Sequence, residues 1–187
     1  TTFADVRVEV IMHVALMLVD FGITYMGLNT DTQQHAYILM PGENSAPKYL
    51  QQALQKGNQL QDIFIGEFAA GRTGNEVLAS SLTKAKAAGL KPTIYTHPLG
   101  YHGHAAGTTL GMWDKQGGVP GDGDYPLHIN TDYSIELNNA VRVEPWGKEI
   151  RIMLEEDAVF DGNGVGVLDS VSYTTRARPT MHVSATQ

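Results

Sequence analysis

Residues 18–22 read Leu-Val-Asp-Phe-Gly, and residues 35–39 read His-Ala-Tyr-Ile-Leu. Both runs are mostly apolar, and a turn signal, Met-Gly-Leu-Asn, lies between them at residues 26–29. The pattern predicts β structure over residues 7–19 and 20–40, with a hairpin that turns near residues 25 and 26. In that hairpin Asp20 and Asp31 are almost opposite, with Cβ atoms roughly 5 Å apart. Two such carboxylates repel each other unless a cation lies between them, although an exposed turn position for one of them is an equal alternative.

The middle of the chain predicts two helices. Apolar residues recur at three- and four-residue steps over residues 47–70, which is typical of an amphipathic helix, here weakened near Gly57. A second helix is expected from Thr73, where Thr-Gly-Asn-Glu has the form of a capping box, to Gly89. Further strands are predicted at residues 93–96, 133–137, 140–143 and 150–160, with an irregular loop at 115–126. This order favours an α+β domain whose helices cover one face of a largely antiparallel sheet.

Composition limits the partners. A chain of 187 residues that is 42% hydrophobic and 18% charged fits one soluble globular domain, which we place at residues 1–169, with a polar tail at 170–187. The net charge of −7 argues against nucleic acid as a partner, because phosphate binding needs a basic surface. The chain has no cysteine, so any metal must be held by oxygen and imidazole ligands.

The most apolar early stretch, residues 8–19, is interrupted by His13 and is too short to span a bilayer. It also lacks the basic start and the small-residue cleavage site of a signal peptide. We therefore expect no membrane partner, and the localisation stays open, with the cytoplasm slightly favoured.

Residues 97–107 contain three histidines, His97, His102 and His104, among glycines. Imidazole is the commonest nitrogen ligand for metals, and glycine lets a ligand approach the backbone closely, although such loops also occur on plain surfaces.

Four glutamates lie in or near the late predicted strands: Glu136, Glu144, Glu155 and Glu156. Glu136 has apolar neighbours on both sides, which makes an unpaired exposed role less natural, whereas Glu144, before a proline, is best interpreted as an ordinary loop acid. Together with the aspartates and a histidine, these carboxylates suit a pair of Mn, Co, Zn or Fe ions roughly 3.5–4 Å apart that act on a water.

These motifs resemble those of the pita-bread metallopeptidases, which include methionine aminopeptidase, Xaa-Pro aminopeptidase and prolidase. An Asp-Phe-Gly strand followed eleven residues later by a second Asp corresponds to Asp20 and Asp31. The family's Gly-His-x-x-Gly loop corresponds to His104, and its aromatic-small-Ile-Glu strand to Glu136. Its final Arg-Ile-x-Glu-Asp strand corresponds best to Glu156. The resemblance covers residues 14–162.

The resemblance implies a creatinase/aminopeptidase-like fold, a curved and largely antiparallel sheet covered by helices, of which this chain is the C-terminal, metal-binding half. It implies two divalent ions, Mn first and Zn, Co or Fe as alternatives. Asp20 would bind one ion, Asp31 and Glu156 would bridge both, and His104 and Glu136 would complete the second. A metal-bridging hydroxide would remove the first residue of a peptide, with proline following. The bridging glutamate, Glu156, or an adjacent one would take the proton and pass it to the leaving amine, and we name Glu136 as the catalytic candidate. A homodimer is a further expectation.

Two departures from the family bear on activity. A second histidine normally follows the ligand loop and stabilises the oxyanion, whereas here the sequence reaches Trp113 and Asp114. Trp113, His97 or His102 would have to substitute, so we name both of these histidines as catalytic candidates. The family's first half, which adds a substrate-facing histidine, lies outside this sequence.

Three rival interpretations remain. A catalytically silent relative would keep the fold and bind a ligand or partner without hydrolysis. A non-metal hydrolase of the creatinase type is disfavoured, because such relatives lose the metal carboxylates. A structural assembly protein has no repeat, coiled coil or charge run to support it.

Overall fold

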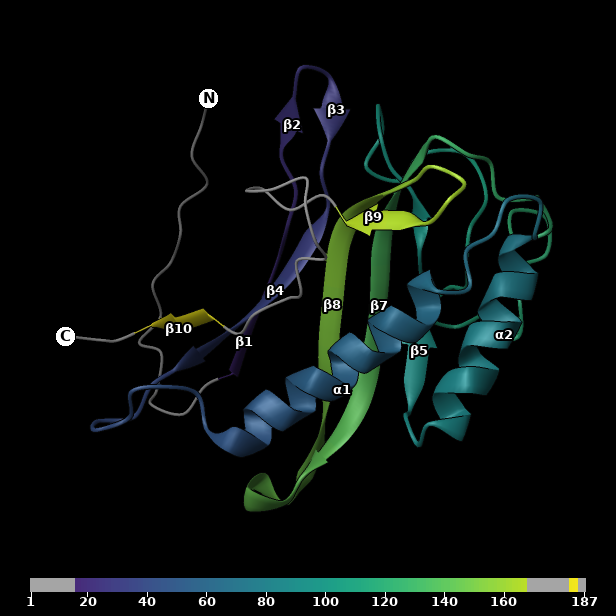
Figure 1. Ribbon diagram of the computed structural model, residues 1–187. Helices are drawn as coiled ribbons and strands as arrows, with labels where there is room; N and C mark the ends of the chain where they lie inside the picture. The colour runs from purple at the N-terminus through teal and green to yellow at the C-terminus, as the bar shows by residue number, and fades with distance from the viewer. Residues whose placement is uncertain (1–15, 168–181, 185–187) are drawn as a thin grey trace.

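A computed structural model describes residues 16–167 and 182–184 of the chain, and these form a sheet with two helices packed on one face (Figure 1). The elements in chain order are β1 (Leu16–Phe21), β2 (Thr24–Tyr25), β3 (Leu28–Asn29), β4 (Thr32–Ile38), α1 (Lys48–Ile65), α2 (Gly74–Ala87), β5 (Pro92–Ile94), β6 (His97–Pro98), β7 (Thr131–Val143), the 3-10 turn η1 (Glu144–Trp146), β8 (Lys148–Phe160), β9 (Val165–Val167) and β10 (His182–Ser184).

The expected α+β order is confirmed, with differences in detail. The two strands predicted at 133–137 and 140–143 are one continuous strand, β7. The strand expected before residue 16 lies outside the described residues. So does most of the tail at 170–187, of which β10 is described.

The long β7–β8 ribbon organises the sheet. Its two strands pair antiparallel over their full length, from Thr131 with Phe160 to Val143 with Lys148. The main path runs β1-β4-β8-β7-β5; β6 also pairs with β7, β9 with β8, and β10 lies parallel to β4. The sheet is therefore largely antiparallel, as predicted, and residues far apart in sequence meet on its central strands.

Helix α1 packs against this ribbon, and α2 packs against α1 and β5 on the same side of the sheet (Figure 1). Gly57 weakens α1 as a helix but lets it approach the sheet, because a Cβ atom there would lie 2.7 Å from Cγ2 of Ile152. The capping box at the start of α2 is confirmed: Glu76 N donates to the Thr73 hydroxyl at 3.2 Å, and Thr73 N donates to the Glu76 carboxylate at 2.8 Å.

The core lies between the helices and one face of the ribbon. Ile135, Leu137, Ile152 and Leu154 point to this face and are at most 1% exposed. Because side chains alternate along a strand, the residues between them must face the other side of the sheet. That second face carries the polar residues Ser134, Glu136, Asn138, Glu155 and Asp157.

Candidate metal centre

A row of polar side chains crosses four strands on the face away from the helices. Asp20 of β1 pairs with Gln33 of β4, Gln33 pairs with Glu155 of β8, and Glu155 pairs with Glu136 of β7. Gln33 Nε2 donates to Glu136 Oε1 at 2.8 Å. Three carboxylates from three strands are therefore held in one line, although all four residues are distant in sequence.

Asp31 joins this row from just before β4. Its ligand atom lies within 4.8 Å of those of Asp20 and Glu155, and its backbone N donates to Asp157 Oδ1 at 3.0 Å. The sequence predicted that Asp20 and Asp31 lie almost opposite each other. This prediction is wrong, because Asp20 pairs with Gln33. The reason is the turn, which uses Met26 (φ 51°) and Gly27 (φ 84°) and so lies one residue later than expected. A one-residue shift of the turn moves the register by two and leaves the aspartates diagonal on one face.

Two stacked histidines close the cluster from the β6 side. His97 is 3% exposed, and its ring stacks on that of His104 with centroids 4.0 Å apart. The Nε2 atoms of both histidines lie 3.9 Å from Oδ2 of Asp31. His97 also forms a compact group with Glu136 and Glu155, whose ligand atoms lie within 4.8 Å of one another. His97 Nδ1 donates to the Pro98 carbonyl at 3.1 Å, so its Nε2 is left as an acceptor.

Three buried atoms in this cluster have no hydrogen-bond partner among the described residues: Gln33 Oε1, His97 Nε2 and Glu155 Oε2. Nearly all buried polar atoms in native proteins are paired, so each of these calls for an explanation. The imidazole nitrogen of His97 and the carboxylate oxygen of Glu155 are atoms of the types that bind Mn, Zn, Co or Fe. A cation in the cluster would satisfy both of them.

The electrostatics of the centre lead to the same conclusion. Burial, followed by repulsion from Glu155, raises the pKa of Glu136 to about 8, and burial raises the pKa of Glu155 to about 7. Burial lowers the pKa of His97 to about 4 and raises the pKa of Asp31, which Asp20 raises further. Protein charges alone thus leave these carboxylates poorly stabilised, and the residues present fit a divalent cation in charge, ligand type and position.

Two sequence-predicted site residues are not brought into the cluster. Glu156 pairs with Ile135, so it lies on the opposite face from Glu155, where Gln34 Nε2 donates to its Oε1 at 3.0 Å. His102 is exposed and makes an edge contact with Tyr101. The sequence interpretation placed Glu156, and not Glu155, in the candidate ligand set. The alternation of side chains along the strand could have indicated the opposite choice. Ile152 and Leu154 are apolar core residues, and Glu156 follows them at two-residue steps, so Glu155 lies on the opposite face.

Other sequence candidates lie around the cluster or away from it. Glu144 pairs with Arg142 at 3.4 Å in the β7–β8 connection, as expected of a loop acid. Trp113 packs edge-on against Tyr95 with ring centroids 5.7 Å apart, and the Tyr95 hydroxyl lies 3.0 Å from His104 Nδ1. These aromatic rings form a wall beside the two histidines.

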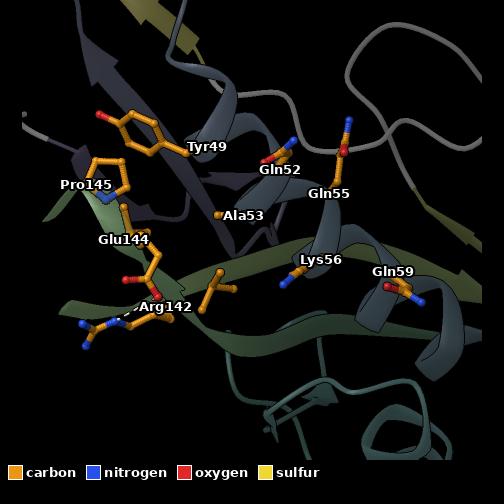
Figure 2. A pocket seen from close by; sticks show the side chains of 11 residues that line it. Tyr49, Gln52, Ala53, Gln55, Lys56, Gln59, Arg142, Glu144 and Pro145 are labelled. Atoms are coloured by element: carbon orange, nitrogen blue, oxygen red, sulfur yellow. Dashed lines mark ion pairs between the residues drawn. The ribbon is translucent and has the colours of Figure 1, made fainter. Parts of the chain in front are cut away.

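Figure 2 shows a cavity of about 520 Å³ between α1 and the end of β7. Tyr49, Gln52 and Lys56 reach it from the helix, and Arg142 and Glu144 from the strand side. It is built on the helix-covered side of the ribbon, so it is separate from the carboxylate cluster.

Within the described residues neither helix is long and apolar enough to cross a membrane. No protein-family model matches the chain, and no curated protein matches its sequence.

Solved structures do match. An X-Pro aminopeptidase from Thermotoga maritima superposes with a TM-score of 0.65 at 20% identity, over 92% of this chain and 42% of its own. A methionine aminopeptidase from the same organism superposes with a TM-score of 0.59 at 15% identity, over 83% of this chain and 64% of its own. The N-terminal domain of the FACT complex subunit SPT16 from chickpea superposes with a TM-score of 0.61 at 10% identity, over 95% of this chain and 41% of its own. The chain thus spans less than half the length of the X-Pro aminopeptidase, and the resemblance is confirmed at the level of architecture: this chain has the pita-bread fold, over a length consistent with its C-terminal half.

Proposed function

We propose that this chain is the metal-binding part of a dinuclear metallo-aminopeptidase that removes the first residue of peptides in which proline follows. The observation that carries the proposal is the cluster on the polar face of the sheet. Carboxylates of β1, β7 and β8 meet there with Asp31 and His97, and two buried ligand atoms lack a partner among the described residues.

The ligand set that we propose is Asp20, Asp31, His97, Glu136 and Glu155. Glu155 replaces Glu156, because it is the glutamate that faces the cluster. Four carboxylates and one imidazole suit Mn first, with Zn, Co or Fe as alternatives. Two such ions, when bound, supply an activated water and polarise the scissile carbonyl.

The surrounding residues would then orient the reaction. Gln33 holds Glu136 through its 2.8 Å hydrogen bond, which places that carboxylate to take a proton and return it to the leaving amine. In the family, the oxyanion-stabilising histidine follows the ligand histidine by several residues. If His97 is the ligand, His104 has that position, and we assign it the oxyanion-stabilising role. Tyr95 would orient His104 through their 3.0 Å contact.

A peptide is the partner that this site suits, and a homodimer stays a proposal that rests on the resemblance. The negative charge of the chain offers little to nucleic acid.

A catalytically silent relative is the second candidate. The same fold occurs in the N-terminal domain of a FACT complex subunit, and this chain spans 42% of the length of the X-Pro aminopeptidase. Such a protein would bind a ligand or partner through this fold without hydrolysis.

Metal content separates the two candidates. The protein is stripped with a chelator, exposed to Mn or Zn, and analysed by elemental mass spectrometry beside hydrolysis of an Xaa-Pro peptide. Near two ions per chain with cleavage supports the peptidase, and metal without cleavage supports the silent relative. Absence of metal overturns the ligand assignment. Asp31→Ala should lose the shared site, whereas Asp114→Ala, in an exposed loop, should keep both ions.

A further inference from the structure

The polar face continues past the carboxylates into a cleft. Strands β4 and β8 pair at Gln33 and Glu155 and then diverge (Figure 1). A cleft of about 620 Å³ lies between them, and Leu18, His35 and Met153 line it. Each lies two residues from a member of the polar row that crosses the sheet: Leu18 from Asp20, His35 from Gln33, and Met153 from Glu155. They therefore form the next row of side chains on the same face.

His35 lines this cleft and links the strands on either side of it. Its Nε2 accepts a hydrogen bond from Met153 N at 3.0 Å, and its Nδ1 donates to the Met17 carbonyl at 3.2 Å. A ring that donates at one nitrogen and accepts at the other is neutral. His35 therefore bridges the diverging strands without adding a charge.

The positive charge on the polar side of the cleft comes from Arg151, which shares the face of Met153 and Glu155 along β8, whereas Lys148 shares the face of Ile152 and Leu154. Arg151 and Lys148 are both exposed, and Arg151 Nη1 donates to Asn138 Oδ1 at 3.2 Å, which orients the guanidinium. Lys148 Nζ lies 5.6 Å from the ring centroid of Trp146, which also lines the cleft. Among the described lining residues there is no carboxylate, although the chain as a whole has a net charge of −7. An apolar floor with a cationic end suits an apolar chain that ends in an anion.

We propose that this cleft binds the downstream end of the substrate, with the C-terminal carboxylate of the peptide at Arg151. The inference rests on the proposed aminopeptidase function. Arg151 lies four residues along β8 from Glu155, or roughly 13 Å at the rise of a strand. An extended peptide covers that span with about four residues. One residue precedes the cut, so the cleft selects peptides of about five residues.

Trp146 provides a direct readout of binding. The chain has two tryptophans, so a Trp113→Phe background leaves Trp146 as the single reporter. The probes are Ala-Pro-Ala-Ala-Ala as the free acid and as its C-terminal amide, titrated by fluorescence into metal-free protein and into Mn-loaded protein. The free acid should bind about tenfold more tightly than the amide. Arg151→Gln should reduce acid binding to the level of the amide and leave amide binding unchanged, while Lys115→Gln in an exposed loop should change neither.

Equal affinity for acid and amide, or no fluorescence response to either peptide, overturns the inference. So does an amidated peptide with an internal Asp that binds as tightly as the free acid, because the anion would then be a side chain. Metal content and hydrolysis are measured on the same samples. Discrimination without metal or cleavage would keep the carboxylate site and reject the peptidase, and cleavage without discrimination would do the reverse.

Discussion

The two faces of the β7–β8 ribbon are both buried, yet their chemistry is opposite. The helix-covered face carries Ile135 and Leu154, and the other carries Glu136 and Glu155, from the same two strands. Burial stabilises the first pair, whereas it raises the pKa values of the second pair to about 8 and about 7. One face therefore stabilises the fold, and the other holds carboxylates whose charged form is disfavoured by burial.

The largest effect is expected on the core face. Leu154→Ala removes a side chain that is 1% exposed and should lower the free energy of unfolding by about 2–5 kcal/mol. Urea denaturation measures this loss. The folded fraction should still bind its full complement of metal, because the side chain points away from the cluster. Loss of metal from that folded fraction would contradict a division of roles between the faces.

The next residue along tests the polar face. Glu155→Gln should weaken metal binding at least about hundredfold, because a ligand loses its charge. The metal-free protein should be as stable as the parent or more so, since a buried charge beside Glu136 is gone.

Glu156→Gln is the matched control, and it should change metal affinity by less than about twofold. Equal losses in both glutamine variants, measured by competition with a chelator, would mean that the two faces are not separate in function.

A carboxylate on the helix side sharpens the contrast. Burial of Glu67 alone would raise its pKa, but hydrogen bonds from Lys84, Ser80 and Arg72 outweigh burial and lower it to about 2. The folded-state pKa thus lies below the unfolded value of 4.5, so the stabilisation is present above pH 4.5 and is lost as the pH falls toward 2.

Glu67→Gln should therefore cost about 1–2 kcal/mol at pH 7, a figure kept modest because the partner Lys84 is largely exposed. The difference from the parent should shrink near pH 3. Urea denaturation at both pH values measures it, and a difference that does not depend on pH would show that the ion pairs contribute little.

Local signals in the sequence predicted much of the fold. The capping box at Thr73 and the amphipathic spacing of α1 depend on neighbours along the chain, and both are confirmed. Residue patterns also identified the acidic strands and the histidine loop. Whether these residues hold metal stays a prediction.

What the sequence could not supply was register. Choosing Glu155 over Glu156 requires knowing which partner on β7 each one faces, and that pairing joins residues about twenty positions apart. The sequence named His97 only as a catalytic candidate. Its place among the carboxylates was hidden for the same reason, because it depends on the pairing of β6 with β7 at Ser134. A Gly-His-x-x-Gly motif favoured His104, which the structure puts on the exposed side of the His97 ring.

The smallest effect is expected at the aromatic wall beside the polar face. Trp113 is 40% exposed and contacts Tyr95 edge-on, and it is Tyr95 that contacts both His97 and His104. Trp113→Phe keeps an aromatic ring at that edge, so it should lower the free energy of unfolding by about 0.5–1 kcal/mol and leave the metal content unchanged. Urea denaturation and elemental analysis measure the two quantities. If an ion is lost, Trp113 takes part in metal binding, and the residues that the metal centre depends on extend to this aromatic wall.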